Sequence, residues 1–370
     1  MLLAILAVGG GVSYGVYRTQ KAELLGGASQ DLEKASKAFV RALDQVFQPA
    51  LTLSQSVLDS GIRHRTGTDL AEHFFAVVIG PVRQFEHVNG AFLGFPDGRF
   101  LHLQDLALAD EAPGEGGERG QPVVRRRIID RPDRDSAGHW QRFDPESSHW
   151  QETTVEHRPY DPRQRPWYKA AIEGGGPVWT DAYVFASSGK LGVTYAEPIY
   201  DDAGAVWAVL GVDLSLGSLS RTLIVTADAL AGTGDVVFAT DLANKMLGHP
   251  DFVAHAAELD RDTEAFLAQY RQPDSFESLV VHAVDHPGEI TEVEAQGRSY
   301  LATKFQLDPT KAMPLQVFLA RDLQTVLAGA VSTVRRNVAL VFLAVVVFAT
   351  VATYAVKLRV EAAARRKAEA

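Results

Sequence analysis

One stretch near the C-terminus constrains the chain more than any other, because it has no charged residue over the length that a helix needs to cross a bilayer. Residues 338–356 read VALVFLAVVVFATVATYAV, with Arg335 and Arg336 before them and Lys357 after them. A bilayer core requires about 20 mainly apolar residues in an α-helix. A buried helix of a soluble protein rarely lacks charges for so long, so we predict a transmembrane helix at 338–356.

A shorter apolar run lies at the N-terminus. Residues 2–17 carry no charge and are followed by Arg18 and Lys21. A cleaved signal peptide is the alternative interpretation, but the run has no basic segment before it and no A-x-A site near its end. We therefore predict a first transmembrane helix at residues 1–19, slightly short or tilted in the bilayer.

The flanking charges predict the orientation of these spans. The tail after residue 356 has five basic residues against two acidic ones, which favours a cytoplasmic C-terminus, although Arg335 and Arg336 oppose this mildly. Two spans would place residues from about 20 to 336 outside the cytoplasm. The alanine-rich tail at 357–370 predicts a cytoplasmic connector helix.

Composition excludes several kinds of partner and chemistry. A chain of 370 residues exceeds a usual single core and predicts about two domains. The formal net charge of −10 argues against nucleic acid as a partner. The densest basic cluster, residues 125–127, is interpreted as the exposed face of a surface strand. The absence of cysteine removes disulfides, thiolate zinc sites and cysteine nucleophiles.

Catalytic motifs are also missing from the sequence. It contains neither G-x-S-x-G nor H-E-x-x-H, and no glycine-rich phosphate loop. The best metal-like cluster, His249, Asp251 and His255, lies in a loop-like segment without a further ligand nearby. We therefore predict no enzyme, no metal and no cofactor. A membrane-anchored enzyme acting outside the cytoplasm is the rival hypothesis, which a bound metal or turnover would support.

Helical periodicity dominates the segment that follows the first run. From residue 22 to about residue 65, apolar residues recur every three or four positions, which predicts a long helix that Pro49 should kink or divide. Such a helix could be a stalk that carries a displacement towards the membrane. A helix that only covers a sheet fits the pattern equally well.

The stretch from residue 160 to residue 216 predicts a ligand pocket on a small sheet. Prolines on either side of Arg165 should hold it extended in front of a helix that begins at Pro166 and ends at three glycines from Gly174. Strand-like runs follow at 179–185, 192–200 and 206–214.

The concave face of this sheet could bring opposite charges together. Arg165, Trp167 and Tyr183 would lie at one end and Asp213 at the other. A carboxylate inside an apolar run is costly to bury alone, so Asp213 should meet a cation, backbone N–H groups or a ligand. Pairing with Arg165 alone is an equally good interpretation, and the aromatic residues could simply fill a core.

The same residues carry a resemblance to a known family. YDPRQRPWY from residue 160 and GVDLSL from residue 211 resemble the membrane-distal half of bacterial double Cache (dCache) extracytoplasmic sensor domains. The resemblance implies that a small-molecule ligand, a small carboxylate or an amino-acid-like compound, is held there. Where the family places a second aspartate this chain has Phe185, which favours a ligand with less cationic character. The resemblance implies Tyr160, Arg165, Trp167 and Tyr168 for the ligand carboxylate, and Tyr183 and Asp213 for its ammonium group.

The predicted fold class is α+β, with a long N-terminal helix, two PAS-like (Cache) antiparallel-sheet modules and two flanking transmembrane helices. In the second module we predict helix at 263–270 and strands at 278–284, 289–295, 299–306 and 315–320. The predicted domains are the first span at 1–19, a stalk helix at 20–65, a distal module at 66–220, a proximal module at 221–321, an exit helix at 322–337, the second span at 338–356 and the connector at 357–370.

Together these observations predict the small-molecule sensing part of a two-pass receptor in the bacterial plasma (inner) membrane. The resemblance implies a homodimer formed through the long helix and a cytoplasmic output, with a histidine kinase expected and a nucleotide or diguanylate cyclase or a chemoreceptor as alternatives. A structural or partner-binding module without a small ligand is a further alternative. It would show Arg165 paired with Asp213 and no cavity.

Overall fold

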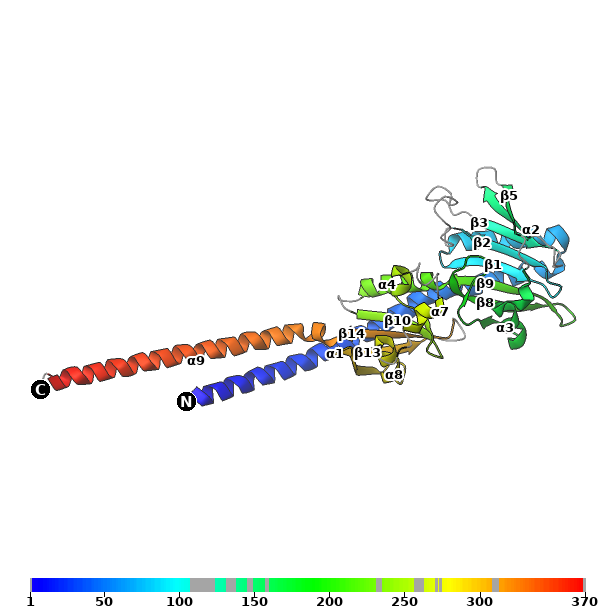
Figure 1. The fold of residues 1–370 in the computed structure, drawn as a ribbon. Helices are drawn as coiled ribbons and strands as arrows, with labels where there is room; N and C mark the ends of the chain where they lie inside the picture. The colour runs from blue at the N-terminus through cyan, green and yellow to red at the C-terminus, as the bar shows by residue number, and fades with distance from the viewer. Residues whose placement is uncertain are drawn as a thin grey trace.

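The computed structural model describes residues 2–106, 124–130, 138–144, 149–156, 160–230, 235–255, 263–269, 272, 275–307 and 313–368. Two antiparallel sheets follow one another along a long N-terminal helix, α1 (Leu2–Asp59), as Figure 1 shows. Both termini lie at one end of the molecule, and the larger sheet lies at the other. The larger sheet therefore lies where the distal module was predicted, and the smaller sheet lies where the proximal module was predicted.

The distal sheet has nine described strands in the order β5-β4-β3-β2-β1-β9-β8-β6, with β7 also paired to β8. All pairs are antiparallel, and helices cover both faces: α1 and α2 (Gly67–Gln84) on one, and α3 (Pro166–Gly174) on the other. The strands are β1 (Val88–Gly94), β2 (Phe100–Asp105), β3 (Val124–Ile129), β4 (Gly138–Asp144), β5 (His149–Glu156), β6 (Val178–Trp179), β7 (Tyr183–Val184), β8 (Leu191–Tyr200) and β9 (Val206–Ser215).

The proximal sheet has five described strands in the order β11-β10-β14-β13-β12. Helix α4 (Leu216–Leu230) follows directly from β9 and connects the two sheets. The remaining elements are β10 (Asp235–Asp241), β11 (Met246–Gly248), α5 (Asp251–Ala254), α7 (Thr263–Ala268), α8 (Phe276–Ala283), β12 (Ile290–Ala295), β13 (Arg298–Gln306) and β14 (Leu315–Asp322).

Two strand predictions were wrong, and one of the two alternatives for Pro49 is excluded. Residues 278–284 were predicted as a strand but form part of α8, because the Ser275 side chain caps the helix at the Ser278 N–H and buried Phe276 and Val280 are one helical turn apart. Pro49 does not divide α1, whose buried face packs on both sheets and offsets the lost hydrogen bond. Residues 179–185 form two short strands, β6 and β7, instead of one.

The C-terminal helix α9 (Leu323–Ala368) joins the predicted exit helix, span and connector into one element. Among the described residues it is the one helix long and apolar enough to cross a membrane, over Leu323–Ala362, and only 6% of its most apolar window is buried. A large apolar surface without protein cover is typical of a membrane span. The first span at 1–19 stays a prediction.

An ion-pair network links α1 to the start of this helix. Arg321 lies at the end of β14, two residues before α9, and its guanidinium contacts Asp235 on β10 at 2.6 Å and Asp31 on α1 at 3.5 Å. These carboxylates raise the pKa of Arg321. The ion pairs of Arg321 therefore connect α1 to the start of α9, where the chain leaves the proximal sheet.

The variant Gly211→Ala tests how tightly aromatic rings pack on the distal sheet. An added Cβ would lie 1.9 Å from Cε2 of Phe92, whose ring is held by Phe100 and Trp167 at centroid distances of 5.8 and 4.7 Å. We expect destabilisation by about 1–3 kcal/mol, the usual cost of overpacking a core. The measurement is the melting temperature, Tm.

The matched control is Gly26→Ala on α1. Gly26 is exposed, and nothing lies within 4 Å of an added Cβ there. Replacing a helix-interior glycine by alanine stabilises by about 0.5–1 kcal/mol, so Tm should hold or rise. The packing described here would be contradicted if Gly211→Ala melted at the wild-type temperature.

Candidate ligand-binding site

Strand register places the candidate residues on one face of the distal sheet. Asp213 on β9 lies opposite Thr194 on β8 and Gly90 on β1. The next row of the same face contains Phe92, His102 and Arg127, which are paired across β1, β2 and β3. Helix α3 lies over this face, so the sheet forms the floor of a pocket and the helix forms one wall.

Local geometry aims Arg165 into this space. Asp161 caps a short 3₁₀ turn (Pro162–Gln164), which leaves Arg165 extended at φ −81° and ψ 148° as the N-cap of α3. Pro166 then begins the helix, and Gly175 ends it with φ 63°. The predicted boundaries of this helix are therefore confirmed.

The structure brings five of the six predicted residues to one cavity of about 20 Å³. Tyr168 is not among the lining residues: its ring packs edge-on against Trp167, with centroids 5.5 Å apart, and lies over Gly94. The lining comprises Tyr160, Arg165, Trp167, Tyr183 and Asp213 with Phe92, Phe100, His102, Arg127, Phe185, Ala186 and Ser187.

His102 and Arg127 were missed at the sequence level. The interpretation of residues 125–127 as an exposed strand face was wrong, since Arg126 and Arg127 are only 7% and 5% exposed. β3 lies inside the sheet, so alternate arginines face α2 on one side and the pocket on the other. The available signal for His102 was the alternation of polar and apolar residues in FLHLQD, residues 100–105.

Asp213 is the buried carboxyl group of the pocket. Its Oδ1 accepts a hydrogen bond of 2.5 Å from Thr194 Oγ1, and the Tyr183 hydroxyl lies 2.6 Å from the same threonine oxygen. Because Thr194 uses its one hydroxyl hydrogen on Asp213, Tyr183 must donate to Thr194. Burial raises the pKa of Asp213 to about 7, against the opposing effects of Thr194 and the charge of Arg165.

Two guanidinium groups lie beside one tyrosine ring. The Cζ atoms of Arg127 and Arg165 are 5.1 and 5.9 Å from the centroid of Tyr160. Burial raises the pKa of the Tyr160 hydroxyl, so it stays neutral. Burial, together with the charges of Arg125 and Arg127, holds the pKa of His102 well below its usual range, so the imidazole is neutral. The lining therefore combines two cations with one carboxyl group.

Arg165 and Asp213 do not form an ion pair within 4.0 Å in the described part of the chain. The alternative hypothesis of a structural or partner-binding module predicted that these two residues pair and that no cavity remains. The predicted pairing is not observed. The cavity itself is small, with room for about one water molecule. A ligand must consequently widen it.

The turn after β7 forms another wall of the cavity. Phe185, Ala186 and Ser187 line the cavity, and the Ser187 carbonyl accepts a hydrogen bond of 3.1 Å from Arg125. The Phe185 ring fills the space above Gly192, where an added Cβ would lie 2.1 Å from its Cζ. This turn therefore closes the pocket through one polar contact and one ring.

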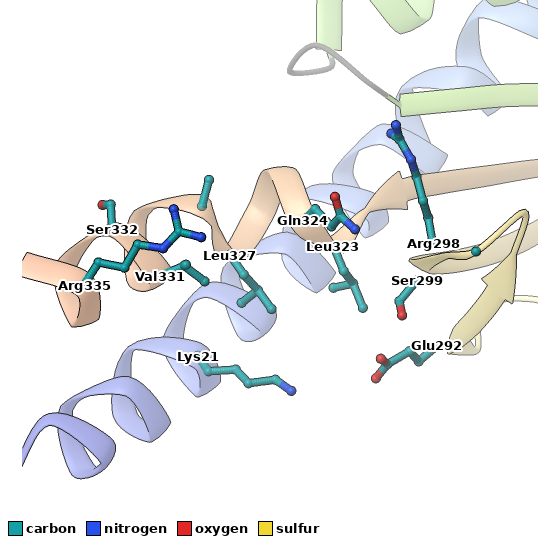
Figure 2. Close-up of a pocket in the computed structure, with 12 residues that line it drawn as sticks. Lys21, Glu292, Arg298, Ser299, Leu323, Gln324, Leu327, Val331, Ser332 and Arg335 are labelled. Carbon is teal, nitrogen blue, oxygen red and sulfur yellow. The ribbon is translucent and has the colours of Figure 1, made fainter. Parts of the chain in front are cut away.

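A larger hollow of about 790 Å³ lies near the membrane end, between α1, α9 and the turn of β12 and β13. Figure 2 shows Lys21, Glu292 and Arg335 spread around an open groove, with Leu327 between them. Arg298 is paired with Asp322 at 3.0 Å. The groove is larger than the distal cavity, but Glu292 and Arg335 are exposed and its charges do not converge, so the distal pocket is the better candidate site.

The predicted surface-loop cluster also lacks the features of a metal centre. His249 is buried and lies 3.2 Å from Glu277 and 3.4 Å from Asp251. Within the described ranges, no group of three or more His, Asp or Glu side chains could hold a metal ion. The histidine instead joins the loop before α5 to α8.

Two antiparallel-sheet modules on one long helix, with a small polar pocket in the distal module, form the architecture expected of a double Cache sensor domain. Residues 141–221, which contain most of the candidate site, match the family described as "Methyl-accepting chemotaxis protein-like, first PDC sensor domain". The predicted resemblance is therefore confirmed, and so is the α+β fold with a long N-terminal helix and two PAS-like antiparallel-sheet modules. The matched family is a sensor-domain family and not a family of catalytic domains.

Named relatives agree with this class. Adenylate cyclase 1 of Rhizobium meliloti is 26% identical over 269 residues, which is 71% of this chain and 39% of the cyclase. Methyl-accepting chemotaxis protein PscA of Pseudomonas syringae is 41% identical over 92 residues, 25% of this chain and 14% of PscA. The chain thus spans well under half of the length of these curated relatives.

A solved structure has the same fold. The sensory domain of the Campylobacter jejuni chemoreceptor Tlp3 superposes with a TM-score of 0.53 at 14% identity, covering 84% of this chain and 99% of that domain. Its ligand-binding domain in complex with L-valine gives a TM-score of 0.52 at 14% identity, covering 83% and 98%. At this identity the likeness shows the architecture of the two modules.

The pKa of Asp213 predicts a pH dependence of stability. A folded-state pKa of about 7 lies above the unfolded value of about 3.9, so the protonated carboxyl favours the folded state. That stability is fully present below about pH 4 and is lost as the pH rises through about 7. Since a neutral amide at this position would avoid a buried charge, we expect Asp213→Asn to exceed the wild type by about 1–4 kcal/mol at about pH 8 and to match it at about pH 4.

The measurement is Tm of both proteins across this pH range. The amide oxygen of the variant can still accept from Thr194, so the hydrogen bond is preserved, and the titration of other groups cancels in the difference. A difference that does not change with pH would contradict a carboxyl group that titrates near neutrality.

Proposed function

We propose that this chain is the sensing part of a bacterial transmembrane receptor whose distal pocket binds a small carboxylate of amino-acid type. The observation that carries the proposal is the convergence of Arg165, at the N-terminus of α3, and buried Asp213 on one cavity. A helix N-terminus and a guanidinium both stabilise an anionic group. The named relatives include chemotaxis proteins, and one structural neighbour is a chemoreceptor domain in complex with L-valine.

In this proposal the ligand carboxylate binds Arg165, with Tyr160 and Trp167 around it. The ammonium group, where the ligand has one, binds Asp213, and Tyr183 orients Thr194 against that carboxylate. Tyr168 supports Trp167 from behind instead of touching the ligand. Phe185 contributes no charge, so Asp213 would carry the recognition of a cationic group.

Binding would select an open arrangement of the pocket. The closed cavity of about 20 Å³ excludes an amino acid, so the ligand must favour a state in which the turn after β7 has moved. A ligand shifts such an equilibrium only by its difference in affinity for the two states. The contact between Arg125 and Ser187 is the bond that opening would break.

Strand β8 offers a path from the pocket to α1. Thr194 faces the pocket, while Tyr195 faces α1, because neighbouring strand residues point to opposite faces. The Tyr195 hydroxyl donates to Glu197 Oε2 at 3.0 Å, and Ser54 on α1 donates to the same oxygen at 2.5 Å. The Trp179 ring lies between Tyr195 and Phe47 of α1, at centroid distances of 5.2 and 5.3 Å.

The signal would then leave through α9, which begins beside the Arg321 ion pairs with α1 and β10. We propose a two-pass topology in the plasma membrane with the sensor modules outside and a cytoplasmic output, in a homodimer. The named relatives are a cyclase and a chemotaxis protein. The matches to the chemotaxis protein and to the sensor family support a chemoreceptor output. The cyclase match, over 71% of the chain, supports a cyclase-type output, and a histidine kinase stays a prediction.

The variant Arg165→Ala tests the proposed carboxylate site. The full chain, in detergent, is screened by thermal shift against amino acids, dicarboxylates and diamines. Saturation at about 100 times Kd stabilises the native state by about 2.7 kcal/mol, so a ligand should raise Tm by several degrees. We expect this rise to disappear in Arg165→Ala while Tm without ligand is retained.

The matched control is Arg163→Ala. Arg163 lies two residues earlier but is exposed and bonds Asp161 and the Pro96 carbonyl, so the ligand-dependent rise should persist. A rise that survives in Arg165→Ala would remove that arginine from the site. No rise with any compound would favour a structural or partner-binding module.

A further inference from the structure

We propose that the distal pocket has a second anion subsite, formed by Arg127, His102 and Gln104, and that its ligand is therefore a short dicarboxylate such as an acidic amino acid. This inference rests on the proposed function, because it assigns the far end of the ligand whose first carboxylate binds Arg165. The three residues of this subsite lie on β2 and β3, on the same face of the sheet as Asp213 but on the other side of β1.

Two buried nitrogen atoms on this side lack a hydrogen-bond partner within the described residues: Nε2 of His102 and Nε2 of Gln104. The two side chains are 4% and 0% exposed. They project from the same face of β2, because they are two residues apart. An unsatisfied buried polar group costs about 1–3 kcal/mol. A ligand atom that accepts hydrogen bonds from both nitrogens would remove this cost.

Gly90 connects this pair to Asp213. It lies between Asp213 and Gln104 in the strand register, and an added Cβ would be 3.1 Å from Nε2 of His102. The His102 ring therefore fills the space above Gly90, and its nitrogen lies one strand away from Asp213 in the wall that both residues form.

The charges of the lining favour two anionic groups on the ligand. The cavity is lined by two guanidinium groups, of Arg127 and Arg165, and by one carboxyl group, of Asp213. A ligand with two carboxylates can therefore place one at each guanidinium, whereas a ligand with one carboxylate can bind only one of them.

The spacing of the arginines fits one small molecule. Their distances to the Tyr160 centroid limit the two Cζ atoms to at most about 11 Å apart. A four- or five-carbon dicarboxylate with a guanidinium at each end spans a separation of this order. The Tyr160 ring would then lie along the chain of the ligand.

The test compares L-glutamate with L-norvaline by titration calorimetry on the full chain. The two amino acids have the same carbon chain, and the second carboxylate replaces a methyl group. We expect the wild type to bind L-glutamate at least 10-fold more tightly. The variant Arg127→Met should reduce this ratio at least 10-fold through weaker L-glutamate binding, with L-norvaline little changed.

The variant Gln104→Glu is the second test. Gln104 Oε1 accepts from Arg125 at 3.0 and 3.1 Å, and a carboxylate keeps this contact while the nitrogen becomes an anionic oxygen. Repulsion should then reverse the preference, so that L-norvaline binds more tightly than L-glutamate. Gln141→Glu is the matched control, because Gln141 accepts from Arg126 at 2.8 Å on the opposite face of the sheet; its ratio should stay at the wild-type value.

The outcomes separate this inference from the proposed function. Equal or tighter binding of L-norvaline to the wild type would overturn the second subsite and leave the carboxylate site at Arg165 standing. A ratio unchanged in both Arg127→Met and Gln104→Glu would also overturn it. If neither amino acid binds, the proposed function fails and the subsite fails with it.

Discussion

The burial of charge between the distal sheet and α3 is the constraint on which the rest of this site depends. A carboxyl group and two guanidinium groups line a cavity with space for about one water molecule. The protein tolerates this because Asp213 is half neutral near pH 7 and holds a hydrogen bond from Thr194, and because Tyr160 presents its π face to both arginines. Such an arrangement is stable enough to fold but is not fully satisfied, which is the condition under which a ligand gains most from entering.

The aromatic packing explains why the pocket is closed and yet able to change. Phe92 fits over Gly211, and Trp167 and Tyr168 fit over Gly94, so the end of the pocket beside α3 is rigid. The opposite wall is a turn held by the Phe185 ring and by Arg125. Because that wall follows β7, which pairs with β8, movement there reaches the strand that bonds α1 through Glu197 and Ser54. The rigid and the movable walls are therefore on different sides of the same ligand space.

Much of this could be predicted from the sequence where local rules decide the outcome. Prolines on either side of Arg165 and the glycines after residue 173 set the bounds of α3, and the alternation of 206–214 predicted β9 with Asp213 on its pocket face. The wrong predictions share a cause, because contacts with neighbouring elements, and not the local sequence pattern, decided the structure of these segments. Residues 276–283 are helical because Ser275 caps them and one face is buried. Arg126 and Arg127 are buried because β3 is internal, which no pattern within residues 125–127 reveals.

The length of α1 has a mechanical consequence. A helix of 58 residues is about 87 Å long, at 1.5 Å per residue. Ser54 and Phe47 attach its far end to the pocket module, and Asp31 attaches its middle to Arg321. If that middle contact is a fulcrum, a rotation of about one degree moves an end of such a rod sideways by about 0.8 Å. An angular change too small to disturb either sheet would thus become a lateral step at the membrane, and occupancy of the pocket would be reported by leverage while both modules keep their internal packing.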